Sequence, residues 1–251
     1  MIHVKVGIPR EVKNNEFRVA ITPAGVHELV RHGHQVVIER GAGLGSSIPD
    51  EEYVAEGARI LDTADEVWAT ADLLLKVKEP VAEEYHRLRK DQTLFTYLHL
   101  AASKECTDAL IESGTTAIAY ETVELPSRAL PLLAPMSEVA GRLAPQVGAY
   151  HLMRSVGGRG VLPGGVPGTQ PARAVVIGGG VSGWNATQIA VGMGFHVTLL
   201  DRDINKLREA DKVFGTQVRA IMSNSFELEK AVLDADPVSY THLTLPTNRE
   251  V

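Results

Sequence analysis

The sequence predicts an α/β protein with two Rossmann-like parallel-sheet domains, of which the second is incomplete. Short apolar strands alternate with helical segments along most of the 251 residues, as in the βαβ units of parallel sheets. A proline-rich segment at 125–135 interrupts this alternation. After this segment the alternation of strands and helices ends early. A complete six-stranded dinucleotide fold has about twice as many strands as follow here. We therefore expect a first domain over 1–128 and an incomplete second domain over 129–238.

In the first expected domain, predicted strands and helices alternate regularly. Thr22 is a suitable N-cap before Pro23, and Gly33 follows the helix that they begin. The glycine-rich segment 41–47 is expected to be a plain loop, because no fitting helix starts directly after it. We expect strands over 3–8, 35–39, 59–61, 73–77, 93–98 and 116–121. We expect helices over 24–32, 50–56, 64–70, 81–89 and 103–113.

The second block begins with a long helix over 136–155, a candidate bridge between the domains, which Pro145 should kink or split. A Gly/Pro-rich loop follows at 157–171. A further strand could begin at Pro237. Residues 239–251 are mostly polar and resemble a translated sequencing adapter, so we expect a non-native tail there. Between these segments we expect strands over 174–177, 196–200 and 218–222 and helices over 182–193, 203–214 and 225–235.

A glycine motif stands between the strand at 174–177 and the helix after it. Gly178, Gly180 and Gly183 have G-x-G-x-x-G spacing, and Asp201 closes the next strand 23 residues after Gly178. The first glycine permits a tight turn, the second lets a pyrophosphate approach the helix N-terminus, and the third lets the helix approach the strand. Asp201 suits a ribose diol and would repel a 2′-phosphate, which favours NAD over NADP, although Arg202 opposes this preference.

Composition excludes several classes of function. Apolar residues make up 44% and charged residues 22% of the chain, which is typical of a globular protein, and the net charge is −6. No basic stripe suggests nucleic acid, no metal site is predicted, and no run approaches the roughly 20 apolar residues of a membrane span. The single cysteine, Cys106, is expected to be a small helix residue rather than a nucleophile. Without a signal peptide, a cytoplasmic enzyme is expected.

Three polar residues of the first block follow predicted strands. Arg18, Lys78 and His99 come after the strands over 3–8, 73–77 and 93–98 respectively. Ligands of open parallel sheets bind at the carboxyl edge of the strands. Arginine can hold a carboxylate, lysine a carbonyl oxygen, and histidine can move a proton near neutral pH. Together they would suit a small 2-oxo or 2-amino acid, while each alone is equally compatible with a solvated or structural side chain.

Several longer motifs resemble a known family. Gly-Ile-Pro-Arg-Glu at 7–11 and Asn-Glu-Phe-Arg-Val-Ala-Ile-Thr-Pro at 15–23, followed by Gly25 and Val26, resemble the N-terminal signature shared by alanine dehydrogenases and the nucleotide-binding subunit of proton-translocating transhydrogenase. The segments 73–80, 95–101 and 134–141 are similar to alanine dehydrogenases in particular. The resemblance covers 3–238. His99, between Leu98 and Leu100, favours the dehydrogenases because the transhydrogenases generally lack it.

The resemblance implies an oxidoreductase of amino-acid metabolism that interconverts L-alanine with pyruvate and ammonia, using NAD. It implies that Arg18 binds the substrate carboxylate, Lys78 polarises the carbonyl, and His99 is the acid/base. Ammonia would add to pyruvate, water would leave, and the iminium carbon would receive hydride. For Lys206 a solvated helix lysine is the alternative. The positions that match NAD contacts of the family are Ser137, Val181, Asp201, Lys206 and Ser223.

The resemblance also implies features that these residues lack. The family uses a second catalytic aspartate and an asparagine from later strands of the nucleotide domain, so we expect no turnover from this chain alone. A homo-hexamer is implied for the full-length parent. The alternatives are a transhydrogenase subunit that works with a membrane partner, and a fragment that only binds NAD or does not fold.

Overall fold

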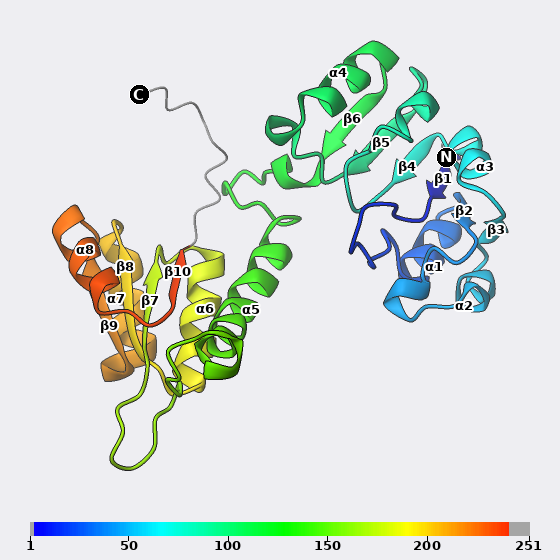
Figure 1. The fold of residues 1–251 in the computed structure, drawn as a ribbon. Helices are drawn as coiled ribbons and strands as arrows, with labels where there is room; N and C mark the ends of the chain where they lie inside the picture. The colour runs from blue at the N-terminus through cyan, green and yellow to red at the C-terminus, as the bar shows by residue number, and fades with distance from the viewer. Residues whose placement is uncertain (1–2, 241–251) are drawn as a thin grey trace. The chain divides into compact units, whose positions relative to one another are not determined.

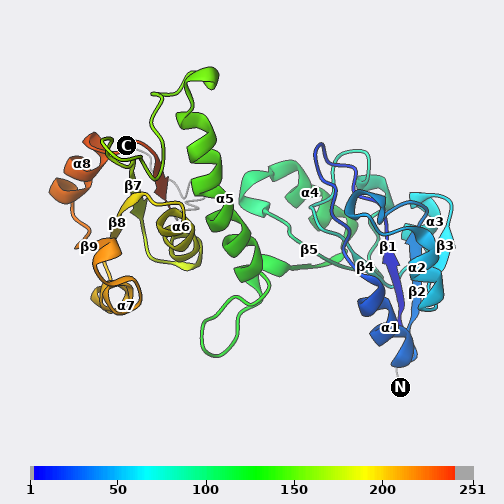
Figure 2. The same ribbon diagram turned by 90° about the horizontal axis from the view of Figure 1, so that it is seen from below.

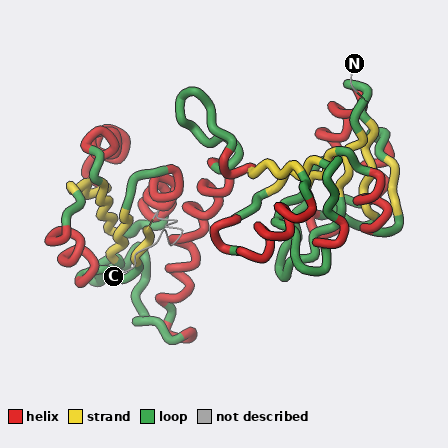
Figure 3. The backbone as a smooth tube through the Cα atoms, turned by 90° about the horizontal axis from the view of Figure 1, so that it is seen from above, coloured by secondary structure: helices red, strands yellow, loops and turns green. Residues whose placement is uncertain are grey.

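The computed structural model describes residues 3–240, which form two compact units divided between Leu130 and Pro131. Each unit is a parallel sheet with helices against it, as Figures 1 and 3 show, and this confirms the predicted fold class. Across residues 3–240, no helix combines the length and apolar character needed to cross a membrane.

Unit 1 has a six-stranded sheet in the order β3-β2-β1-β4-β5-β6, with every neighbouring pair parallel. The chain moves outward from β1 to β3 and then crosses back to place β4 on the other side of β1. The point beside β1 is therefore a topological switch, where ligands bind in open α/β sheets. The strands are β1 (Lys5–Ile8), β2 (Gln35–Glu39), β3 (Arg59–Leu61), β4 (Leu73–Leu75), β5 (Thr93–Thr96) and β6 (Thr116–Ala119).

The unit 1 sheet is buried on both faces. On β2, Val36 and Ile38 join one core and Val37 joins the other, because successive side chains of a strand point to opposite faces. Tyr53 from α2 is in the first core and Trp68 from α3 is in the second. Two-sided burial explains why the central residues of β1, β2 and β4 form continuous apolar runs. The α-helices of the unit are α1 (Pro23–Arg31), α2 (Asp50–Ala55), α3 (Ala64–Thr70) and α4 (Lys104–Ser113).

One predicted helix of unit 1 is wrong. Residues 81–89 form turns and a short 3-10 segment at Tyr85–Arg87 instead of an α-helix. The Glu84 carboxylate is turned inward, where one oxygen accepts from Lys76 Nζ at 3.0 Å and the other from the Val81 backbone N–H at 3.1 Å. The segment is thus folded around a buried carboxylate rather than around a helical hydrogen-bond ladder.

Unit 2 has a four-stranded parallel sheet in the order β10-β7-β8-β9. The strand expected near Pro237 is present as β10, which pairs with β7 in a register that joins Val238 to Val175. Residues 241–251, most of the expected non-native tail, lie outside the described residues. The strands are β7 (Arg173–Ile177), β8 (His196–Asp201), β9 (Val218–Met222) and β10 (Val238–Tyr240), and the helices are α5 (Ala134–Leu152), α6 (Val181–Gly192), α7 (Ile204–Phe214) and α8 (Ser225–Leu233).

The long helix α5 is not split by its internal proline. Pro145 is buried within one helix of 19 residues, which begins two residues before the expected start, with Pro135 in its first turn. Helix α5 lies along α6, as Figures 1 and 2 show. Gly141 permits this approach, because a Cβ at that position would collide with the Ser182 carbonyl oxygen.

Candidate functional site

The glycine motif and its acid lie together at the carboxyl edge of the unit 2 sheet. A hollow there is lined by Ile177, Gly178, Gly180, Leu200, Asp201, Arg202, Lys206 and Ser223. It lies beside the point where β7 ends and the chain later returns to β10, which is the topological switch of this sheet. Five of the predicted cofactor residues, Gly178, Gly180, Asp201, Lys206 and Ser223, therefore face one space.

The backbone of the turn explains the first glycines. Gly178 has φ +94°, a conformation that side-chain-bearing residues adopt with strain. At Gly179 a Cβ would approach Asp201 Oδ2 to 3.2 Å, so this position also favours glycine. Gly180 is the N-cap of α6, and within residues 3–240 no side chain caps this helix end. The amide groups of the first helical turn thus suit an anion.

Asp201 is held as a carboxylate. Its Oδ2 accepts from the Gly179 N–H at 2.5 Å, and its Oδ1 accepts from the Asp203 N–H at 2.7 Å. Lys206 Nζ lies 3.8 Å from Oδ2. Burial alone would raise the pKa of Asp201, but these backbone donors and Lys206 outweigh it and lower the pKa below its ordinary value. An ionised acceptor at this edge suits a ribose diol.

Three predicted cofactor residues lie away from the lining of this hollow. Gly183 is buried within α6, Val181 is the exposed first residue of that helix, and Ser137 is in the first turn of α5. Ser223 differs from them, because its backbone N–H donates to the Asp201 carbonyl oxygen at 2.9 Å. The roles of all eight predicted residues in cofactor binding stay predictions.

The polar residues of unit 1 follow three adjacent strands. Arg18 lies in the loop after β1, Lys78 in the loop after β4, and His99 in the loop after β5. Because β1, β4 and β5 are neighbours in a parallel sheet, all three loops leave the same edge beside the switch point. The electrostatic and hydrogen-bond partners of these residues connect them into one cluster.

Arg18 is oriented by an acid two residues earlier. Its Nε donates to Glu16 Oε1 at 2.7 Å and its terminal nitrogen to Oε2 at 2.5 Å. The hydrogen bond from Arg18 lowers the pKa of Glu16, and the charge of Lys78 contributes in the same direction. Tyr97, on the segment that leads to His99, interacts electrostatically with Arg18. Arg18 and Lys78 thus both act on Glu16, and Tyr97 acts on Arg18.

The loop that carries Lys78 is anchored by buried ions. Lys76 is 1% exposed and contacts Glu84 at 3.0 Å and Glu11 at 3.3 Å. Glu11 also accepts from the Val77 N–H at 2.6 Å and from the Lys78 N–H at 3.3 Å. Burial raises the pKa of Glu11, although Lys76 and these donors counteract it. The ionic cluster Glu11–Lys76–Glu84 therefore fixes the backbone at Lys78.

His99 is held in a conformation that is unusual for its residue type. Its φ is 47° and its ψ is 38°, in the left-handed region. Glu121 accepts the His99 backbone N–H at 2.7 Å, and the His99 ring nitrogen Nδ1 lies 3.2 Å from Glu79 Oε2. The centroids of the Tyr97 and His99 rings are 6.1 Å apart. Backbone strain that neighbouring groups maintain is typical of functional positions.

Sequence reasoning missed the acids of this cluster. Glu16, Glu79 and Glu11 each lie in a motif that carries a predicted residue or the N-terminal signature. For Glu79 the sequence did offer a signal, because this acid lies directly between the predicted substrate residue Lys78 and Pro80. The contacts of Glu11 and Glu79 join different loops, so no spacing rule along the chain reveals them, whereas Glu16 contacts Arg18 within one loop.

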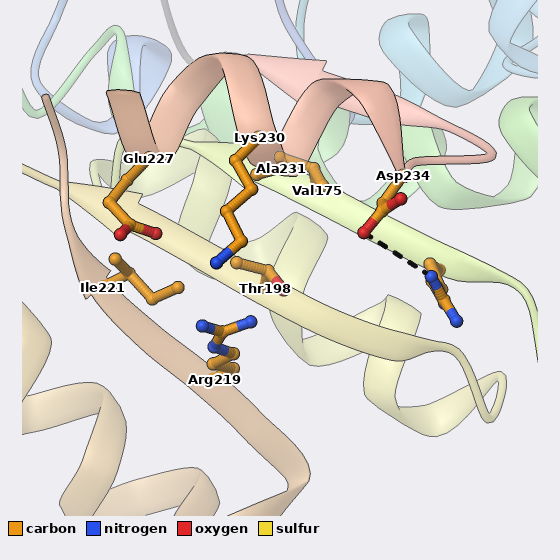
Figure 4. Close-up of a pocket in the computed structure, with 9 residues that line it drawn as sticks. Val175, Thr198, Arg219, Ile221, Glu227, Lys230, Ala231 and Asp234 are labelled. Carbon is orange, nitrogen blue, oxygen red and sulfur yellow. Dashed lines mark ion pairs between the residues drawn. The ribbon is translucent and has the colours of Figure 1, made fainter. Parts of the chain in front are cut away.

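A second hollow in unit 2 lies between α8 and the sheet, away from the glycine motif. Figure 4 shows Lys230 of α8 extending toward Thr198 and Arg219 of the strands and Glu227 extending toward Ile221. Asp234 pairs with Arg173 at 3.7 Å. None of the predicted site residues lines it. Mixed charges on a sheet face indicate a partly covered surface rather than a ligand site.

Two family models match the chain. The model described as "Alanine dehydrogenase/PNT, N-terminal domain" matches residues 7–140, and the one described as "Alanine dehydrogenase/PNT, C-terminal domain" matches residues 144–246. A curated alanine dehydrogenase of Mycolicibacterium smegmatis is 66% identical over 93% of this chain and 63% of its own length. The chain thus spans less than two thirds of this curated relative.

Two solved structures also resemble this chain, an alanine dehydrogenase and a transhydrogenase. An L-alanine dehydrogenase matches with a TM-score of 0.88 and 50% identity, over 93% of this chain and 64% of that chain. A transhydrogenase from Sinorhizobium meliloti matches with a TM-score of 0.79 and 30% identity, over 94% of this chain and 69% of that chain. The dehydrogenase is the more similar of these two in both sequence and fold.

Proposed function

The chain belongs to the alanine dehydrogenase/PNT family, and from this premise we propose that its protein catalyses the NAD-dependent oxidative deamination of L-alanine to pyruvate and ammonia, in a reversible reaction. Because the chain covers 63% of the length of the M. smegmatis relative, the activity is proposed for a protein of the relatives' length. The observation that carries the proposal is the cluster of Arg18, Lys78 and His99 at the switch point of unit 1.

Arg18 and Lys78 would bind the substrate. A guanidinium can hold a carboxylate through two parallel hydrogen bonds, and Glu16 fixes its plane. Lys78 carries a second positive charge within electrostatic range of the same acid. An ammonium group there would draw electron density from the oxygen of a 2-oxo acid and favour attack by ammonia at the adjacent carbon. Two cations that act on the same acid would thus favour a small anionic substrate.

His99 would move protons. Addition of ammonia to pyruvate and loss of water require proton transfers near neutral pH, and imidazole is suited to them. Its side chain is 41% exposed, so the ring can reach a substrate while Glu79 holds one of its nitrogens. In the deamination direction the same group would assist the addition of water and the departure of ammonia.

The hollow in unit 2 would bind NAD. The Gly178 turn and the uncapped start of α6 suit the pyrophosphate, and ionised Asp201 suits the ribose diol. Lys206 and Ser223 line the same space, so we include them among the cofactor residues, with Ser137, Val181 and Gly183 as the predicted remainder. When bound there, NAD would supply hydride transfer to and from the substrate carbon.

The transhydrogenase alternative has weaker support. The M. smegmatis alanine dehydrogenase is 66% identical, whereas the matched transhydrogenase structure is 30% identical. His99 adds to this preference, because a proton-transfer group at the same sheet edge as an arginine that could bind a carboxylate suits amino-acid chemistry. We also propose a homo-hexamer in the cytoplasm for the protein of the relatives' length, as the family resemblance implies.

The activity is tested in a protein extended to the relatives' length. NADH oxidation is followed with pyruvate, with and without ammonium, for the wild type, His99→Ala and the control His86→Ala, which changes an exposed histidine of the same unit. We expect turnover that requires both substrates, a loss of about 10²-fold or more in His99→Ala, and little change in the control. Turnover without ammonium, or an unaffected His99→Ala, would contradict the proposal.

A further inference from the structure

We propose that Glu79 is a positioning residue for His99, and that it selects the ring tautomer in which Nδ1 carries the proton and Nε2 is open to the substrate. The acid/base role of His99 rests on the proposed function, but the tautomer and its dependence on Glu79 do not. None of the sequence motifs assigned a role to Glu79.

The position of Glu79 joins three loops. It follows Lys78 after β4, and its side chain is 11% exposed. One carboxylate oxygen, Oε1, accepts from Lys13 Nζ on the loop after β1. The other, Oε2, lies 3.2 Å from His99 Nδ1 on the loop after β5. Each oxygen of one nearly buried carboxylate is therefore directed at a different partner.

The charge state of Glu79 follows from these contacts. Burial alone would raise the pKa of the carboxyl group, but the hydrogen bonds from Lys13, from its own backbone N–H and from His99 outweigh burial and lower it. An ionised carboxylate can only accept hydrogen bonds. The His99 nitrogen that faces it must therefore be a donor, so Nδ1 carries hydrogen.

The ionised Glu79 carboxylate determines which ring nitrogen of His99 carries hydrogen and which has the lone pair. In a neutral imidazole one nitrogen is a donor and the other an acceptor, and the partner of the first decides which is which. With Nδ1–H directed at Glu79, the lone pair is on Nε2, at the far side of the ring. The backbone N–H of His99 is held separately by Glu121 at 2.7 Å. Backbone and ring are thus each fixed by an acid, and Nε2 is the atom that takes and returns protons.

Lys13 has a supporting part. It neutralises the buried carboxylate and holds the end of Glu79 that His99 does not contact. A purely structural Lys13–Glu79 ion pair would join two loops without any effect on the histidine ring. The two interpretations differ in what the ring does when Glu79 loses its charge but keeps its size.

The test reads the His99 tautomer directly. The full chain is labelled with ¹⁵N-histidine, and the ring nitrogens are observed by NMR at a pH where imidazole is neutral. Because the chain has nine histidines, His99→Asn identifies the signals that belong to position 99. In the wild type we expect a predominant Nδ1–H form. In Glu79→Gln we expect a mixture of both tautomers, because an amide can donate as well as accept.

Two variants serve as controls. Glu83→Gln removes an exposed acid four positions away and should leave the ring signals unchanged. Lys13→Met removes the ion pair while Glu79 still faces the ring, so the Nδ1–H form should persist. A wild type with predominant Nε2–H, or a Glu79→Gln spectrum identical to the wild type, would overturn the proposal. If Glu79→Gln fails to fold, the tautomer observed for His99 in the wild type still tests the proposal.

Kinetics separate this proposal from the proposed function. In a protein of the relatives' length that turns over pyruvate and ammonia, Glu79→Gln should lower kcat by about 10- to 100-fold, the range known for the hydrogen-bond partners of metal-bound histidines, with little change in KM. No turnover in the wild type would count against the proposed function and leave the NMR result standing. Normal kcat in Glu79→Gln would overturn the positioning role.

Discussion

The two units share a strand order, but different chemical groups form the candidate site at the edge of each sheet. In unit 1 the order around the switch point is β3-β2-β1-β4, and in unit 2 the corresponding order is β9-β8-β7-β10. After β7 the chain turns at Gly178 and enters α6 within a few residues, so the backbone itself forms the candidate site. After β1 the residues 9–22 make a long loop before α1, and side chains form the candidate site.

The difference shows two ways to stabilise polar groups at a sheet edge. Amide groups at a helix start need only glycine and a free helix end, and both are local properties of the chain. Side chains such as Arg18, Lys78 and His99 need acids to orient them, and those acids need partners in turn. Unit 1 therefore contains the buried cluster Glu11–Lys76–Glu84.

The largest expected effect tests the buried ions of unit 1. Lys76→Met should lower the free energy of unfolding of unit 1 by about 3–5 kcal/mol, because it leaves two buried carboxylates without their cation. Lys104→Met is the control, since Lys104 is 86% exposed where it pairs with Asp108 and should have little effect. Urea unfolding measures both. A loss below about 1 kcal/mol in Lys76→Met would show that this cluster does not support the site.

The backbone of unit 2 is tested at Gly178. Because φ is +94°, Gly178→Ala should cost about 1–3 kcal/mol of stability and weaken NAD binding by more than about tenfold. Gly192→Ala is the matched control, because the glycine is helical and its Cβ would meet nothing within 4 Å. It should raise stability by about 0.5–1 kcal/mol. Thermal melts and calorimetric titration with NAD measure the two properties.

Position 99 sharpens the comparison, because His99 of unit 1 and Gly178 of unit 2 both have positive φ, but only His99 carries a side chain. His99→Gly should be more stable than His99→Ala by about 1 kcal/mol, since φ is 47° and glycine adopts this region without strain. Both variants should lose turnover. Equal unfolding midpoints for the two variants would mean that the left-handed conformation carries no strain.

The smallest expected effect concerns pH. The pKa of Asp201 is lowered from its ordinary value of 3.8, so the group is ionised at every pH above that value. Its contribution to stability is therefore present above pH 3.8 and is lost as the pH falls further. We expect the affinity for NAD, measured by titration from pH 8 down to about pH 5, to stay constant. A fall in affinity within this window would indicate that another group titrates at the site.

Prediction from sequence succeeded where structure depends on local pattern. The strand over 35–39 and the helix over 64–70 were predicted to the residue, because apolar periodicity and end signals decide them. The Gly178 turn was also predictable, since its chemistry is backbone chemistry. The helix expected over 81–89 failed because Glu84 pairs with Lys76, a contact that no periodicity encodes.

The candidate site of unit 1 was predictable only in part. Arg18, Lys78 and His99 were identified because strands precede them, and the structure places their loops at one edge. The acids that hold them were not: Glu79 and Glu121 contact His99 from other loops, and the local contact of Glu16 with Arg18 has no motif that announces it. The roles of these residues in binding and catalysis stay predictions.

The left-handed backbone at His99 gives mutation a preferred direction at this position. In a lineage that still depends on the proposed reaction, selection opposes every replacement of the imidazole. In a lineage released from that dependence, selection for stability alone would favour glycine or asparagine, which adopt this conformation at the lowest cost. Glycine or asparagine at position 99 of a descendant would then mark the loss of the reaction before the fold itself had changed.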